Sequence, residues 1–349
     1  MTSTSLRRGL GLSILFSVLS IVVLLIITGE GFSVAQMRGM PIWASSVGLA
    51  LMVTAWSLRA VRLSLLSAAL GHRLPFRDAL AFYVSGAFVS HVTPASSGGV
   101  PFLMWAIYRA GMPLGRVSAL LLFDSLFNLT IFLALLPLGP WLRRAGYLAQ
   151  ASPWLVLTVS IAVLLATVLL VLVIARPKQV SAWLGRATSS AVVERLFGHE
   201  RTKRWTTSLR LELRRLVVAV HWLAAKRWPT MIYAAILAIV YWAAYLAIVP
   251  VLILGLEGHV DTFPVMLAQL VFNLLQGFIP TPGSSGGAEI LFAYLFSGFV
   301  SSRHLAALTV YWRIITFYAS LVVGAILLFW VARHVSQTAP HLRRTIKRR

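Results

Sequence analysis

Residues 93–99 read TPASSGG, and residues 281–287 read TPGSSGG. Each motif lies in the middle of an apolar region, 79–110 or 263–300. Proline removes a backbone donor and paired glycines disfavour helix, so each motif predicts a break between two half-helices. Because lipid cannot bond to the backbone groups that a break exposes, we expect both breaks to be buried in protein or to line a water-filled cavity.

The composition is that of a membrane protein. The chain has 349 residues, of which 59% are hydrophobic and 11% charged, which excludes an ordinary soluble globular domain. A helix of about 20 apolar residues crosses a bilayer. Full spans are predicted over 9–29, 43–66, 116–138, 153–175, 230–255 and 305–332. The first is longer than a signal-peptide core, so we expect it to remain as an uncleaved helix.

The two broken regions are short on each side of the break. Flanks of about 12 to 18 residues are typical of re-entrant hairpins, which enter and leave on one side, although full crossing stays open. The predicted fold class is an all-α, polytopic integral membrane protein with about six full spans and two re-entrant half-helix hairpins.

An internal duplication relates the two motifs. The offset that superposes Ser96–Gly99 on Ser284–Gly287 also brings the second predicted span onto the fifth. Three full crossings separate the hairpins, so they enter from opposite sides; if each pair crosses fully, it adds an even number of crossings and the inversion survives. Inverted repeats with discontinuous helices are a recurring architecture of secondary transporters. The predicted units are a first repeat, 1–150, with spans one to three and hairpin 79–110; a second repeat, 151–338, with spans four to six, a basic loop 176–228 and hairpin 263–300; and a basic tail, 339–349.

The formal net charge of +22 follows the positive-inside rule. Arg7 and Arg8 precede the first span, the chain ends in HLRRTIKRR, and loop 176–228 carries twelve Lys and Arg against three Glu. One loop disagrees, because Arg143 and Arg144 fall on the opposite side. We therefore expect a multi-pass protein of the cell (inner or plasma) membrane with both termini cytoplasmic, and no nucleic-acid partner.

The basic loop has apolar residues at helical spacing between its cations, as in LRLELRRLVVAVHWL. This pattern predicts a surface helix on anionic headgroups, and docking of a partner protein or a lipid headgroup is the alternative. Homo-oligomerisation is left open. The chain has no cysteine, its eight histidines lack the close pairing of a metal site, and no Walker sequence occurs, so we expect no metal, nucleotide or other cofactor.

The breaks are the predicted substrate site. A helix restarts after each Ser-Ser-Gly-Gly, so the motif supplies N-cap hydroxyls, glycine backbone and the positive end of a helix dipole to a phosphate or carboxylate. The alternative is that small residues only allow close helix crossing. The predicted substrate-binding residues are Thr93, Pro94, Ser96, Ser97, Gly98, Gly99, Pro280, Pro282, Gly283, Ser284, Ser285, Gly286, Gly287, Glu289 and Arg313.

Few ionisable residues lie at membrane depth. Asp124 and Glu289 are the acids there and are candidates for ion or proton coupling. Glu289 follows Gly286 by three residues, so a capping box is its alternative role. Arg313 lies near the position equivalent to Ser125, and either binds lipid phosphate or neutralises an acid.

Other polar residues of the spans receive structural predictions. Arg59 and Arg62 are expected to snorkel or to contact headgroups at the cytoplasmic end of the second span. Asn128, Asn273 and Gln276 are expected to form hydrogen bonds between helices.

The sequence PTPGSSGGAE, followed by VYWRIITFYASLVVGAIL, resembles the flippase-like transmembrane region of lysylphosphatidylglycerol synthases. The resemblance covers nearly the whole chain. Its most specific residues are Pro280, Pro282, Gly283, Gly286, Glu289 and Arg313, whereas Ser284 stands where the family often has another glycine. Because the chain ends soon after the last span, we expect no aminoacyl-transferring domain.

The resemblance implies translocation of a lipid with a charged or sugar-bearing headgroup, and the duplication favours alternating access. We therefore predict a flippase for a lipid whose headgroup is charged and contains phosphate. An ion-coupled transporter of a small anion would use the same helix tips. A lipid-modifying enzyme is the third class, but no Asp, Glu and His cluster suited to catalysis is found, so we expect no enzymatic activity.

Overall fold

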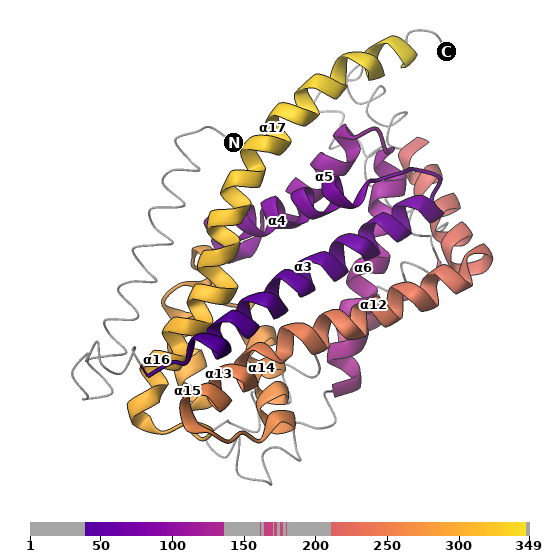
Figure 1. Ribbon diagram of the computed structural model, residues 1–349. Coiled ribbons are helices and arrows are strands. Elements are labelled where there is room, and N and C mark those ends of the chain that lie inside the picture. Colours follow the sequence, from indigo (N-terminus) through magenta and orange to yellow (C-terminus); the bar gives the residue numbers. More distant parts are fainter. Residues whose placement is uncertain are drawn as a thin grey trace, which may run out of the picture.

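The computed structural model describes residues 39–135, part of 161–179, and 211–346, with side chains up to 333 (Figure 1). The described residues contain helices and no strand. The helices are α3 (Ile42–Ala69), α4 (Phe76–Val92), α5 (Gly99–Arg109), α6 (Leu114–Leu135), α12 (Trp228–Leu246), α13 (Ile248–Glu257), α14 (Thr262–Gln276), α15 (Gly287–Phe296), α16 (Ser302–Arg313) and α17 (Ala319–Ile346). Short turns η1 (Pro94–Ser96) and η4 (Pro282–Ser284) and wider π-helical turns η3 (Trp222–Lys226) and η5 (Ile314–Tyr318) join some of them.

Among the described residues, four stretches are long and apolar enough to cross a membrane, namely Ile42–Ala69, Leu114–Leu133, Trp228–Glu257 and Ser302–Arg333. They coincide with the predicted second, third, fifth and sixth spans. The predicted span 9–29 and most of 153–175 lie outside the described residues. Large apolar side chains such as Ile236, Ile239, Val322, Ile326 and Phe329 point outward. A surface of this kind is stable only against lipid, and the protein is an all-α multi-pass membrane protein.

Two central spans run antiparallel. α3 packs along α12 and α13. Near the start of α3, a Cβ added at Gly255 would lie 2.6 Å from the Ala44 Cβ. Near its end, the Trp222 indole donates a hydrogen bond to the Ala69 carbonyl over 3.0 Å. The end of α3 and the start of α12 therefore share one end of the bundle.

Each predicted break separates two helices. The pair α4 and α5 follows the end of α3, and the pair α14 and α15 follows the end of α13, so the pairs occupy opposite ends of the bundle (Figure 1). Their turns share an unusual backbone: Ala95 and Ser96 have φ of 50° and 52°, and Gly283 and Ser284 have 59° and 55°. These residues are equivalent under the offset that relates the two motifs, so the duplication extends to the local conformation.

The two turns meet. η1 packs against η4, and the Ala95 N–H donates to the Pro280 carbonyl over 3.3 Å. At Gly283 an added Cβ would lie 2.9 Å from the His91 carbonyl oxygen and 2.5 Å from a Phe317 ring carbon. The second turn is thus wedged between the end of α4 and the wide turn η5. The expectation that protein covers the breaks is met for η4 by this contact.

Helix α17 crosses α4 with almost no space between the backbones. A Cβ at Gly324 would lie 2.6 Å from the Phe88 Cβ and 2.7 Å from the Val84 carbonyl oxygen. Gly324→Ala should therefore push α17 off α4 and cost about 1–3 kcal/mol, the usual penalty of overpacking. Thermal unfolding of the detergent-solubilised protein measures this loss. The matched control is Gly298→Ala, whose Cβ meets nothing within 4 Å, and equal melting temperatures for the two variants would contradict the close crossing.

Candidate functional site

Four hydroxyls of the two motifs, on Thr93, Ser97, Thr281 and Ser284, bond within the turns or to the preceding helix. The Ser285 hydroxyl is buried and has no hydrogen-bond partner among the described residues. The Thr93 hydroxyl accepts a hydrogen bond from the Gly98 N–H over 3.0 Å, and the Ser97 hydroxyl donates to the Pro94 carbonyl over 2.8 Å. In the second turn the Ser284 hydroxyl donates to the Gln276 carbonyl over 2.9 Å. The N-cap residues of α5 and α15 are Gly98 and Gly286, neither of which has a capping side chain. The prediction of serine N-cap hydroxyls is therefore wrong.

The glycines of the first motif are needed for packing. At Gly98 an added Cβ would lie 2.7 Å from Thr93 Cγ2, and at Gly99 it would overlap the Ser90 hydroxyl. Close helix crossing, the alternative reading of these residues, therefore accounts for both glycines.

The two turns differ in accessibility: residues 94–97 are exposed, whereas residues 283–285 are buried.

Glu289 and Arg313 form a buried ion pair in the second half of the chain. Arg313 Nε lies 2.9 Å from Glu289 Oε1, with the side chains 3% and 0% exposed. Glu289 Oε2 accepts a hydrogen bond from the Gly286 N–H over 2.8 Å, so one carboxylate both caps α15 and neutralises the arginine. The Arg313 guanidinium also lies 4.9 Å from the ring centre of Phe317, the residue that contacts the second turn.

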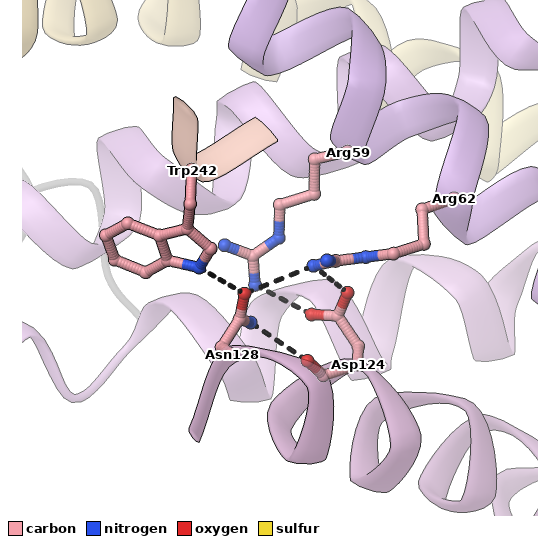
Figure 2. Close-up of polar contacts among 5 residues, drawn as sticks. All are labelled: Arg59, Arg62, Asp124, Asn128 and Trp242. Atoms are coloured by element: carbon pink, nitrogen blue, oxygen red, sulfur yellow. Dashed lines mark hydrogen bonds and ion pairs between the residues drawn. The ribbon is translucent and has the colours of Figure 1, made fainter. Parts of the chain in front are cut away.

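A second charged cluster joins α3, α6 and α12, and Figure 2 shows its five residues. Arg59 Nη2 lies 2.8 Å from Asp124 Oδ2, and Arg62 Nη2 lies 2.6 Å from Asp124 Oδ1. Asn128 accepts a hydrogen bond from the Trp242 indole over 3.1 Å and donates to the Asp124 carbonyl over 2.9 Å. We call these five residues the arginine cluster.

The arginine cluster has a surplus positive charge. Among the described residues it contains two guanidiniums and one carboxylate. Arg59 Nε and Arg62 Nε and Nη1 are buried and donate to none of the described groups. Arg59 is 21% exposed, and its guanidinium lies 4.7 Å from the ring centre of Tyr83. Buried donors without acceptors are rare in proteins, so this cluster has unused capacity for an oxygen ligand.

The other polar residues of the spans can be compared with their predicted roles. Arg313 pairs with Glu289 and so neutralises an acid, which is one of its two predicted roles. Arg59 and Arg62 lie ten and seven residues before the end of α3, about 15 Å and 10 Å along the helix, so both pair with Asp124 instead of snorkelling. Of the three amides, Asn128 bonds between helices as predicted.

The other two amides bond within their own helix. Asn273 donates to the Gln269 carbonyl and Gln276 to the Asn273 side chain, all on α14. The number of charges in the spans could have predicted the arginine cluster. Two arginines lie well inside one span, and Asp124 is the acid available to neutralise both of them. In the part of the chain that the structure describes, no group of three His, Asp or Glu is placed to hold a metal ion.

Comparison with known proteins assigns the chain to a protein family. Residues 10–324 match the family described as the lysylphosphatidylglycerol synthase TM region. The chain belongs to this family. A UPF0104 membrane protein of Archaeoglobus fulgidus is 28% identical over 280 residues, which cover 80% of this chain and 84% of that protein. Family membership confirms the resemblance carried by the second motif and implies a role related to membrane lipids.

The charge balance of the arginine cluster predicts unequal effects of two substitutions. Asp124→Asn leaves two buried guanidiniums without a counter-charge and should cost about 3–5 kcal/mol. Arg62→Met leaves the neutral Arg59–Asp124 pair and should cost less. Thermal unfolding in detergent ranks the two variants, and an Arg62→Met protein as unstable as Asp124→Asn would show that net charge is not what matters here.

Proposed function

We propose that this protein moves a lipid with an anionic, phosphate-containing headgroup between the leaflets of the cell membrane. The observation that carries the proposal is the arginine cluster, with its surplus cation well inside a span. Charge in the membrane is costly and marks substrate or ion pathways. A phosphate oxygen would accept from the unused guanidinium donors and balance the charge.

The position of Arg59 supports access from outside the helix bundle. It is the cluster's partly exposed arginine, whereas Arg62 is 0% exposed and Asp124 3% exposed. The rings of Tyr83 and Tyr241 lie 4.7 Å and 5.9 Å from its guanidinium carbon. Aromatic faces stabilise a cation to which no anionic ligand is bound. We place the lipid phosphate on Arg59, with the acyl chains remaining in the surrounding lipid.

The arrangement of the hairpins supports alternating access between two inverted repeats. The broken pairs follow the ends of antiparallel spans, and their turns are in contact. Hairpins that enter from opposite sides and touch would meet near the middle of the membrane. The exposed first turn and the buried second turn then correspond to one open and one closed side.

The driving force is the lipid gradient or an ion or proton in this proposal. Asp124 and Glu289 stay the candidates for coupling, and a proton taken up by either one would break an ion pair. We propose no enzymatic activity. We also propose that both termini are cytoplasmic, because the described part of the basic loop and the end of α17 carry arginines.

Arg59→Gln tests the proposal with the least risk to folding. It removes the surplus charge and leaves the 2.6 Å Arg62–Asp124 ion pair intact. Arg313→Ala, in contrast, would leave Glu289 as a buried carboxylate without its counter-charge, so loss of folding and loss of transport would coincide. The matched control is Arg77→Gln, because Arg77 stacks 5.3 Å from the Trp330 ring centre, away from the arginine cluster.

The assay uses proteoliposomes with fluorescent phosphatidylglycerol or phosphatidylcholine and scores headgroups that become accessible to dithionite. We expect the wild type and Arg77→Gln to move phosphatidylglycerol faster than empty vesicles do, and Arg59→Gln to be at least tenfold slower. If a folded Arg59→Gln protein transports lipid at the wild-type rate, the phosphate does not bind at this cluster and the proposal is wrong. Uptake of inorganic phosphate without lipid movement would indicate the small-anion transporter, and a chemically changed lipid would indicate an enzyme.

A further inference from the structure

A cavity of about 540 Å³ lies at one end of the bundle, away from the arginine cluster. Its walls come from the end of α3, the start of α6 and the helical segment 211–227. Four arginines line it: Arg116, Arg214, Arg215 and Arg227.

The helices around this cavity show where it lies relative to the membrane. One span ends at Ala69, and two others begin at Leu114 and Trp228, next to the lining residues Leu70, Arg116 and Arg227. The cavity therefore lies at the level of the membrane surface, where lipid headgroups are found. Its walls also carry exposed apolar side chains, including Leu211 and Val218, which suit the glycerol and upper acyl region of a lipid better than a free ion.

Two of the four arginines have structural roles. Arg116 donates to the Leu70 carbonyl over 3.1 Å, and Arg215 pairs with Glu212. Glu212 also accepts a hydrogen bond from the Gly115 N–H over 2.7 Å, which fixes segment 211–227 against the start of α6. The Trp222 indole fixes the same segment against the end of α3. These contacts preform the cavity.

The other two arginines leave positive charge available to a ligand. Arg214 and Arg227 are exposed, and within the described part of the chain neither has an ion-pair partner. The Arg227 guanidinium stacks 5.4 Å from the Trp222 ring centre, which holds it at the cavity. Burial and the nearby Arg116 lower the pKa of His72, so at neutral pH this ring is uncharged and adds nothing to repel a ligand or attract one.

We propose that this cavity binds the phosphate of an anionic phospholipid headgroup at the membrane surface, as a site separate from the arginine cluster. Arg214 and Arg227 supply the charge, Arg116 and Arg215 shape the site, and the apolar wall takes the glycerol region. The proposal concerns binding alone and holds whether or not the protein moves lipid. A lipid bound here would contact segment 211–227, the end of α3 and the start of α6 together.

The test uses the full chain in detergent, titrated with dioctanoyl phosphatidylglycerol, dioctanoyl phosphatidylcholine or inorganic phosphate, with bound ligand counted by native mass spectrometry. All variants carry Arg59→Gln, which removes the surplus charge of the arginine cluster. We compare added Arg214→Gln and Arg227→Gln with a control that instead adds Arg73→Gln and Arg77→Gln, which removes the same charge at the same end of α3. All four arginines are exposed, and one in each pair lies against a tryptophan ring: Arg227 on Trp222 and Arg77 on Trp330.

We expect one phosphatidylglycerol to bind, with affinity about 10- to 30-fold lower after loss of Arg214 and Arg227 and unchanged in the control. Equal binding of phosphatidylcholine, or no effect of the two substitutions, would overturn the proposal. If inorganic phosphate competes at concentrations similar to those of the lipid, the cavity is a site for free phosphate and not for a lipid. Failure of Arg59→Gln to slow transport would leave this result standing, so the two proposals fail separately.

Discussion

A helix cannot be interrupted inside a membrane unless its free backbone groups find partners, and the rest of this structure depends on how two interruptions meet that constraint. The turns at 94–96 and 282–284 lie against each other, with the Ala95 N–H bonded to the Pro280 carbonyl. Gly283 fits between the His91 carbonyl and the Phe317 ring only because it has no side chain. The second break is thereby covered by protein, and the four hairpin helices are held around one point.

The parts of the fold that follow from local chemistry were predictable. Proline and paired glycine locate the breaks, and the length of the apolar runs locates the spans, because each property belongs to a few neighbouring residues. The predicted hairpin 79–110 corresponds to helices that run from Phe76 to Arg109. The positive φ of Ser284 also gives a reason for the glycine often found at its position in the family, since glycine adopts that conformation without strain.

The pairing of charges was not predictable, because it depends on which helices become neighbours. The sequence predicts that Asp124, Glu289 and Arg313 lie in the membrane and that Arg313 can neutralise an acid, but it does not specify which acid. The structure pairs Arg313 with Glu289 on the preceding helix, and Asp124 with α3. The hydroxyls of Ser97 and Ser284 do not cap the next helix for a related reason: the left-handed turn brings carbonyls of the turn and of the preceding helix within their reach, in place of the N–H groups of the next helix.

The two turns are similar in backbone, but the ion pairs of the two halves differ in charge, and this difference constrains the transport cycle that we propose. Glu289 uses one oxygen to cap α15 and the other to neutralise Arg313, so the second half has no net charge left at its ion pair. In the first half, one carboxylate faces two guanidiniums. An anion passing between the halves would not find two equivalent sites. In the cycle that we propose, the phosphate stays near α3 and α6 while the hairpins move around it, so that the similar turns would act as gates and the charge difference would hold the ligand.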